Sequence, residues 1–161
     1  MISGREVARA LRAAYLALHR QTNDCFAKDG MTADQFVLLS ALADADAVTQ
    51  QELDRRVGSD PSTVRAMLVL LEGRGLVARA RHPADGRARC VTLTGKGRQV
   101  FTTLWTKSEL LRARLLSACR PDEVTTLLGF LHRVAEVMAP PASIGNHTTG
   151  MPHLPARKRR A

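Results

Sequence analysis

Residues 60–94 read DPSTVRAMLVLLEGRGLVARARHPADGRARCVTLT, and this stretch decides the fold. It predicts a helix that Asp60 caps and Pro61 begins, because aspartate accepts the free amide N–H groups of a first turn and proline needs no amide partner there. The apolar residues that follow recur at helical spacing, at Val64, Met67, Leu68 and Leu71. Gly75 predicts the left-handed residue that ends the helix.

Two short strands joined by a basic loop are expected after this helix. Residues 76–81 and 90–93 favour strands, and Pro83 and Gly86 between them reverse the chain. Helix, strand, loop and strand in this order are the layout of a winged helix. Asp85 is the only acid among the arginines around the loop, which are Arg79, Arg81, Arg87 and Arg89. Like charges this close repel, which favours a polyanionic partner. The alternative is a solvated hairpin whose arginines point outward.

Two capping boxes predict the helices upstream. Each box begins with a threonine, at Thr32 and at Thr49, and has Gln or Glu three residues later. The second predicts a short helix over about 49–57, preceded by a loop over 44–48. A short helix, a tight turn and the helix that Asp60 caps make a helix-turn-helix.

Several motifs occur in one order across this region. They are Asp60-Pro61-Ser62-Thr63-Val64, Leu71-Glu72, Gly75-Leu76-Val77, and Asp85-x-Arg87-x-x-x-x-x-Leu93-Thr94 followed by Gly95 and Gly97. Together they resemble the MarR family of transcriptional regulators, over 5–138 in layout and 32–98 in motif. The resemblance implies a mainly α fold with a small β-wing. In it, residues 1–138 form a MarR-like domain, with a winged helix-turn-helix over about 32–98 and dimerisation helices over 5–27 and 99–138.

The flanking helices are expected to be long and apolar. The first covers 5–27. After the wing, Thr94 can cap a helix from about 95 to 118, and Pro121 begins another that ends at Met138. These helices offer more apolar surface than one core buries, which favours a homodimer over a larger monomeric helical domain.

Positive charge is concentrated in two parts of this 161-residue chain. The net charge is +9. Residues 49–98 carry ten basic and five acidic side chains, and residues 139–161 carry four basic and none acidic. A localised basic face is typical of nucleic-acid-binding proteins. Residues 139–161 lack helical periodicity, so a disordered basic tail is expected. This tail either strengthens DNA binding without specificity or only aids solubility.

The exposed side of the helix that Asp60 caps is expected to face double-stranded DNA. The candidate residues there are Ser62, Thr63, Arg65, Ala66 and Val69. Arg65 is the candidate for a guanine contact, and the small side chains of Ala66 and Val69 suit thymine methyl groups. Similar proteins usually carry arginine or another polar residue where Ala66, Val69 and Leu70 stand, so the sequence departs from the family here.

The wing residues are expected to bind DNA differently. The resemblance assigns Arg87 to the minor groove, where a narrow A·T-rich groove attracts arginine, and Asp85 to bracing of the wing. Arg79, Arg81 and Arg89 are expected to bind phosphates, which fix the register without reading sequence. A dimer predicts a pseudo-palindromic operator with half-sites about one helical turn apart.

The resemblance implies a sequence-specific transcriptional regulator, a repressor that a small aromatic or acidic effector or an oxidant releases from DNA. Candidate effector-binding residues, equally suited to an ordinary core, are Tyr15, His19, Phe36 and Trp105. Cys25, at the end of the first helix, is the candidate redox sensor. The alternative is a winged helix used for DNA architecture or protein contact, without regulated operator binding.

Other classes find little support in the sequence. It contains no GxxxxGK(S/T), GxSxG or HExxH motif, and its five histidines are scattered, so neither an enzyme nor a bound metal or cofactor is expected. No apolar run approaches the roughly 20 residues of a membrane span, so no membrane partner is expected. Three cysteines without a CxxC pair favour a reducing compartment, and a cytoplasmic location is expected.

Overall fold

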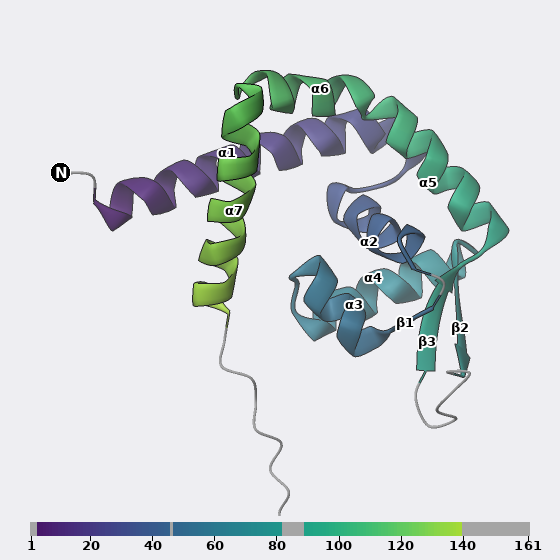
Figure 1. Cartoon of the computed structure of the whole chain (residues 1–161). Coiled ribbons are helices and arrows are strands. Elements are labelled where there is room, and N and C mark those ends of the chain that lie inside the picture. The colour runs from purple at the N-terminus through teal and green to yellow at the C-terminus, as the bar shows by residue number, and fades with distance from the viewer. Residues whose placement is uncertain (1–2, 46, 82–88, 140–161) are drawn as a thin grey trace, which may run out of the picture. The chain divides into compact units, whose positions relative to one another are not determined.

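The computed structural model describes three stretches of the chain, 3–45, 47–81 and 89–139 (Figure 1). The chain divides into two compact units, Met1–Ala118 and Cys119–Ala161. In the second unit the described residues form one helix, α7 (Pro121–Met138). The predicted tail over 139–161 lies outside the described residues, apart from Ala139.

The first unit holds the predicted winged helix-turn-helix. Its elements in chain order are α1 (Gly4–Phe26), η1 (Ala27–Asp29), α2 (Ala33–Ala43), β1 (Val48–Thr49), α3 (Gln50–Val57), α4 (Pro61–Gly73), β2 (Val77–Arg81), β3 (Arg89–Leu93), α5 (Gly95–Lys107) and α6 (Glu109–Ser117). The mainly α fold with a small β-wing is therefore confirmed.

Local sequence signals set the limits of α4 as expected. The Asp60 side chain accepts hydrogen bonds from the amides of Ser62 and Thr63, which have no partner within the helix. At the other end Gly75 adopts a left-handed conformation with φ 70°, and the amide of Leu76 donates to the Leu71 carbonyl at 2.9 Å. This turn aims the chain from α4 into β2.

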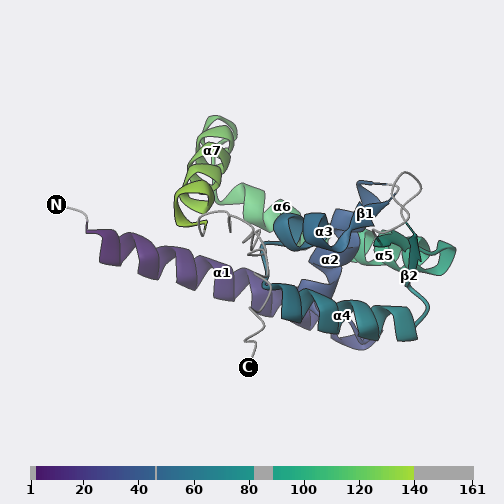
Figure 2. The ribbon, with the colours of Figure 1, turned by 90° about the horizontal axis from the view of Figure 1, so that it is seen from below.

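The core lies between α2, α3, α4 and the sheet, and Figure 2 shows the three helices packed side by side. The predicted apolar stripe of α4 is buried there. Its main partners are Leu38, Leu39, Leu42, Leu53, Leu76 and Val91. Because one side of α4 is fixed in this core, the opposite side is held toward solvent.

The sheet has three antiparallel strands in the order β1-β3-β2. The prediction of a loop over 44–48 was wrong at its end, because Val48 is buried and pairs with Val91 of β3. No local pattern reveals a two-residue strand whose partner lies so far along the chain. The wing strands β2 and β3 match the expected hairpin within one residue.

Of the two predicted capping boxes, the first was confirmed in full and the second only in its threonine cap. Thr32 and Gln35 form the full reciprocal box at the start of α2. At α3, Thr49 caps the amide of Glu52, but the Glu52 carboxylate instead binds Arg55 and Arg56, at 2.6 and 2.9 Å. Two arginines in the next turn compete successfully for a carboxylate that the box would have used.

The single long helix expected over 95–118 is in fact two, α5 and α6, which meet at Ser108; the bend is visible in Figure 1. Ser108 is buried, and its hydroxyl donates to the Trp105 carbonyl at 3.0 Å. The Arg112 guanidinium donates to the same carbonyl at 2.6 Å. These side chains take a carbonyl that an unbroken helix would give to its own backbone, so the helix bends.

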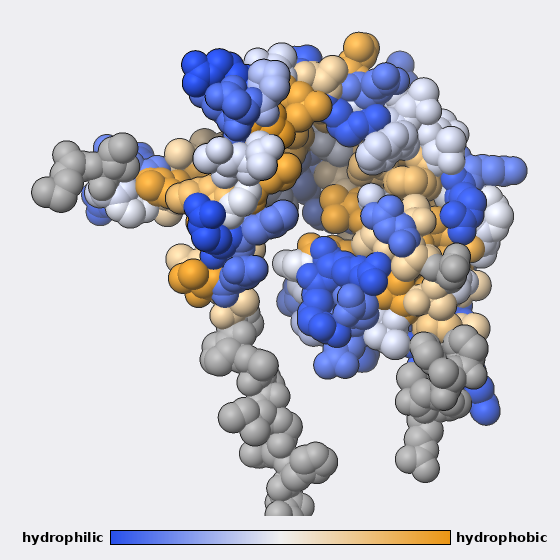
Figure 3. Space-filling model, in the orientation of Figure 1, coloured by the Kyte–Doolittle hydropathy of each residue, from blue (hydrophilic) through white to orange (hydrophobic). Residues whose placement is uncertain are grey.

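Apolar side chains are exposed on several helices outside the winged helix. In the first unit they gather along α1 and on the outer side of α6 (Figure 3). On α7, Leu127, Leu128 and Leu131 are each more than a third exposed. Among the described residues, no helix combines the length and apolar character that crossing a bilayer requires.

Candidate nucleic-acid interface

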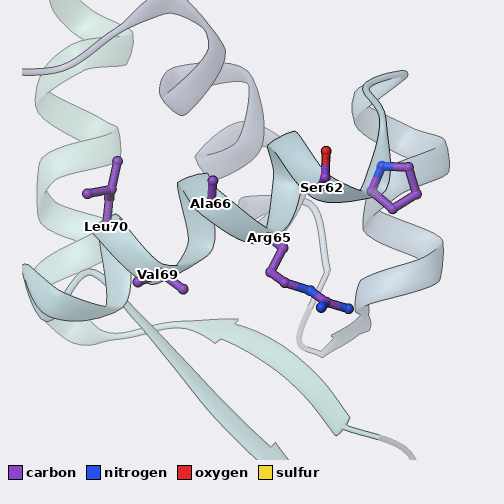
Figure 4. Close-up of a pocket in the computed structure, with 6 residues that line it drawn as sticks. Ser62, Arg65, Ala66, Val69 and Leu70 are labelled. Carbon is purple, nitrogen blue, oxygen red and sulfur yellow. The ribbon is translucent and has the colours of Figure 1, made fainter.

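The exposed side of α4 forms a shallow, mainly apolar hollow. Its lining residues are Pro61, Ser62, Arg65, Ala66, Val69 and Leu70. Figure 4 shows two rows along the helix, with Ser62, Ala66 and Leu70 on one side and Arg65 and Val69 on the adjacent side. The structure thus places four of the five predicted residues of this helix on one surface, and the fifth, Thr63, is exposed next to them.

Asp60 engages both hydroxyls at the start of α4. The side chains of Ser62 and Thr63 donate to its carboxylate, and so do their backbone amides. These bonds, led by the one from the Ser62 hydroxyl, hold the pKa of Asp60 far below its usual range. Toward a DNA phosphate the two hydroxyls therefore offer oxygen lone pairs rather than hydrogens, which makes them weaker phosphate ligands than the sequence suggests.

Arg65 lies in the electrostatic field of Asp54 on α3. Burial raises the pKa of Asp54, and the positive charge of Arg65 opposes that rise. Within the described stretches, Asp54 Oδ1 is buried without a hydrogen-bond partner. The charge of the predicted guanine-reading residue is thus partly offset by a carboxylate on the neighbouring helix.

The wing arginines fall into two groups. Arg79 on β2 lies 3.3 Å from the Glu72 carboxylate on α4, and its side chain is only 24% exposed. The two side chains form an ion pair without a hydrogen bond. Arg79 Nε and Nη2 are both buried, and neither has a hydrogen-bond partner in the described part of the chain. Arg81 and Arg89 are exposed cross-strand neighbours. The other two predicted wing residues, Asp85 and Arg87, lie outside the described residues.

A second hollow, of about 230 Å³, lies between α1, α2 and α6. Three of the predicted effector-binding residues, Tyr15, His19 and Phe36, line it. The other lining residues are Leu18, Thr22, Ala33, Asp34, Val37, Ser108, Leu111, Arg112 and Leu115. Trp105 does not line it but stacks on Phe36, with 6.4 Å between ring centroids. The Arg112 guanidinium lies 3.8 Å from the centroid of the Trp105 ring, a cation–π geometry.

A hydrogen-bond chain in the wall of this hollow assigns the His19 tautomer. Asn23 Oδ1 accepts from the Ala33 amide at 2.8 Å, so its amide nitrogen faces His19 Nδ1 at 3.1 Å. That nitrogen can only donate, so Nδ1 is the acceptor and Nε2 carries the hydrogen. His19 Nε2 then donates to Asp34 at 3.2 Å, which ties α1 to the first turn of α2.

The thiol of Cys25, at the end of α1, meets the backbone at the end of α5. It is partly buried, and its sulfur donates to the Lys107 carbonyl at 3.6 Å. The Lys107 ammonium binds the Asp29 carboxylate at 2.6 Å. An oxidant sensor needs a thiolate stabilised by positive charge. Of the other cysteines, Cys90 is buried and Cys119 is half-buried.

The sequence matches the profile of the MarR family over residues 31–88, the stretch that runs from the start of α2 into the wing. Over this stretch the chain is similar to the MarR family. A curated relative, the uncharacterized HTH-type transcriptional regulator YdgJ of Bacillus subtilis, is 30% identical over 105 residues. The match covers 65% of this chain and 64% of YdgJ, slightly less than two thirds of that relative.

Solved MarR-like structures extend the likeness over most of the chain. BpsR of Bordetella bronchiseptica, whose DNA binding is regulated by 6-hydroxynicotinic acid, is 28% identical, with a TM-score of 0.74, and the match covers 84% of this chain and 98% of that one. A variant of MarR from Escherichia coli, complexed with operator DNA, is 27% identical, with a TM-score of 0.71 and coverage of 80% and 92%.

Several residues of the second hollow became visible only in the structure. Asp34, Ser108 and Arg112 belong to the second hollow, and Asn23 fixes its histidine. The spacing of four residues between His19 and Asn23 is a detectable helical signal. Arg112 gave no such signal, because its position depends on the bend at Ser108. Within the described stretches, no group of three or more His, Cys, Asp or Glu side chains is placed to hold a metal ion.

Proposed function

We propose that this protein is a sequence-specific DNA-binding transcriptional regulator, a cytoplasmic repressor that acts as a homodimer. One observation carries the proposal: α4 presents an exposed face with Arg65, next to a wing whose exposed arginines, Arg81 and Arg89, project from paired strands. In a helix-turn-helix the second helix enters the major groove, and phosphate contacts fix its register. The named relatives are transcriptional regulators, so the proposal includes no catalysis.

The DNA contacts divide by chemistry. Arg65 binds guanine O6 and N7, because its exposed guanidinium carries the only side-chain charge in the α4 hollow among the described residues. Arg81 and Arg89 bind phosphates. Arg87 enters the minor groove, and Asp85 braces the wing. The apolar faces of the helices within 5–27 and 99–138 join two copies, which sets two recognition helices against a pseudo-palindromic operator.

The hollow behind α2 holds the effector. Its aromatic walls at Tyr15 and Phe36 suit a planar ring, and the Arg112 guanidinium suits an acidic group. Because the hollow touches α1, α2 and α6, an occupant contacts both the flanking helices and the winged helix. A small aromatic acid that binds only one arrangement of these helices changes DNA affinity by its differential binding.

The proposal is tested by measuring binding to the DNA upstream of the protein's own gene and to a scrambled duplex, each over a salt series. We expect at least about a thousandfold preference for the upstream duplex and a steep salt dependence. A panel of small aromatic acids is then titrated into the complex, and at least one is expected to release the DNA. Failure to bind either duplex at low salt would contradict the DNA-binding function itself.

A second candidate is a DNA-architectural module, and the apolar character of α4 favours it. Val69 and Leu70 are 57% and 59% exposed on the face that should read bases. A helix without polar reading groups binds duplexes with little preference. Equal, salt-steep binding to the upstream and scrambled duplexes would select this candidate over the operator-reading regulator.

A further inference from the structure

Three apolar side chains stand where a recognition helix usually carries polar ones. Ala66, Val69 and Leu70 form an exposed apolar ledge on α4, and Val69 and Leu70 each have more than half of their surface in contact with water. Large apolar side chains exposed side by side are unfavourable unless a partner covers them. The ledge therefore requires an occupant that is apolar where it touches α4.

The charge around the ledge indicates that the occupant belongs to duplex DNA. Arg65 lies one helical turn from Val69 in the same row (Figure 4), and residues 49–98 carry twice as many basic as acidic side chains. A partner that meets this surface must be polyanionic at its margins and apolar at one point. The major groove of DNA has that combination, with phosphates at its edges and pyrimidine C5-methyl groups on its floor.

We infer that Ala66, Val69 and Leu70 read the C5-methyl group of pyrimidines in the major groove. The inference rests on the proposed DNA-binding function. The three side chains have no hydrogen-bonding group, so they cannot distinguish the O4 acceptor of thymine from the N4 donor of cytosine. They sense only whether the methyl group is present. The ledge accordingly accepts thymine and 5-methylcytosine and disfavours uracil and unmethylated cytosine.

The geometry of α4 also places the methyl group relative to the guanine that Arg65 binds. Four residues separate Arg65 from Val69, which corresponds to about 6 Å along a helix. Successive bases on one strand are about 3.4 Å apart along the duplex axis. A helix lying along the groove thus sets the methylated pyrimidine within about two base steps of the guanine.

The test uses one duplex, selected by the full-length wild-type protein from a random library. Each thymine is replaced singly by deoxyuridine, which removes the methyl group and leaves the pairing unchanged. At the sensitive position, C·G and 5-methyl-C·G pairs are then compared. Burial of one methyl group predicts about a fourfold weaker Kd for uracil than for thymine, and about a fourfold stronger Kd for 5-methylcytosine than for cytosine.

Val69→Thr is the test variant, because it exchanges one methyl group for a hydroxyl of similar size at an exposed position. We expect it to bind thymine and uracil duplexes within about twofold of each other. Val137→Thr is the matched control: it makes the same exchange on α7, where the side chain is 82% exposed and, by helical period, lies on the side opposite Leu128. Thermal unfolding checks that both variants fold.

The outcomes separate this inference from the function it rests on. If no duplex is enriched and none is bound, the proposed DNA-binding function fails. If a duplex is enriched and bound, but every uracil replacement changes Kd by less than twofold, the methyl-reading inference is overturned. The part of Val69 in this reading is overturned if Val69→Thr discriminates uracil from thymine as strongly as the wild type does. A ledge that docks a protein instead of DNA would leave Kd insensitive to every uracil replacement.

Discussion

Asp54 carries a carboxylate that the folded protein would be more stable without. Burial raises its pKa above the ordinary value of 3.8, so the folded chain binds a proton there more readily than the unfolded chain does. The group therefore destabilises the fold progressively as pH rises from 3.8 through the raised folded pKa, and the penalty persists at neutral pH.

Asp54→Asn removes that charge and is expected to raise the Tm at pH 7. The gain should vanish toward pH 3, where the carboxyl is protonated in both states. The same substitution should tighten DNA binding, because Arg65 then keeps its full positive potential. Thermal unfolding at the two pH values and one Kd measurement check this. Asp24→Asn, at an exposed carboxylate on α1, is the control. A lower Tm for Asp54→Asn at pH 7 would show that the carboxylate has a partner.

Arg79 is expected to position the wing rather than bind a phosphate, because Glu72 competes for its guanidinium. Each phosphate contact adds about 0.9 to the slope of log K against log salt concentration. Arg79→Ala should weaken DNA binding with that slope nearly unchanged, whereas Arg81→Ala should lower the slope by about one. If both variants lower the salt slope equally, Arg79 binds a phosphate, as the sequence suggested.

At the level of elements, the start of α5 is held against Leu76, which links α4 to β2, by close backbone contact. A Cβ atom on Gly97 would lie 1.9 Å from the Leu76 carbonyl oxygen, whereas one on Gly95 would have no neighbour within 4 Å. Thr94 strengthens the junction, since its hydroxyl donates to the Gly75 carbonyl at 2.7 Å and accepts from the Gly97 amide at 2.9 Å.

Two glycine substitutions two residues apart should therefore behave differently. Gly97→Ala forces backbone to move and is expected to cost about 1–3 kcal/mol of unfolding free energy, as overpacked sites do. Gly95→Ala should be neutral or slightly stabilising, because alanine is the better helix former. Urea unfolding measures both. If Gly97→Ala is as stable as Gly95→Ala, α5 can shift away from Leu76 at little cost.

Elements marked by caps and apolar periodicity were predictable, and those decided by other contacts were not. The Asp60 cap, the stop at Gly75 and the buried stripe of α4 follow from residues within one or two turns. Strand β1 depends on Val91, far along the chain. The bend at Ser108 depends on the hydrogen bonds that Ser108 and Arg112 donate to the Trp105 carbonyl, which helical periodicity does not reveal. The α4 surface was predicted residue by residue because one buried stripe determines what the other side exposes. The second hollow was predicted only at Tyr15, His19 and Phe36, since Asp34 and Arg112 reach it through tertiary packing.

For the whole molecule, the exposed leucines of α7 predict that two copies associate. The wild type should sediment at twice the 17.6 kDa of one chain at micromolar concentration. Leu128→Glu puts a charge among these leucines and should shift the protein toward the monomer, with weaker operator binding as a result. Val137→Glu, on the side of α7 opposite Leu128, is the control for added charge. A Leu128→Glu variant that remains dimeric would remove this side of α7 from the interface.

The two-residue strand β1 has a consequence for protein synthesis. Val48 pairs with β3, so the sheet stays incomplete until the growing chain has emerged from the ribosome as far as Leu93. Until then α2 and α3 can form, but the apolar side chain of Val48 is left in water, and bringing it to Val91 requires closing a long loop. The nascent winged helix is thus a late-folding unit, vulnerable to proteases and dependent on uninterrupted elongation across the wing.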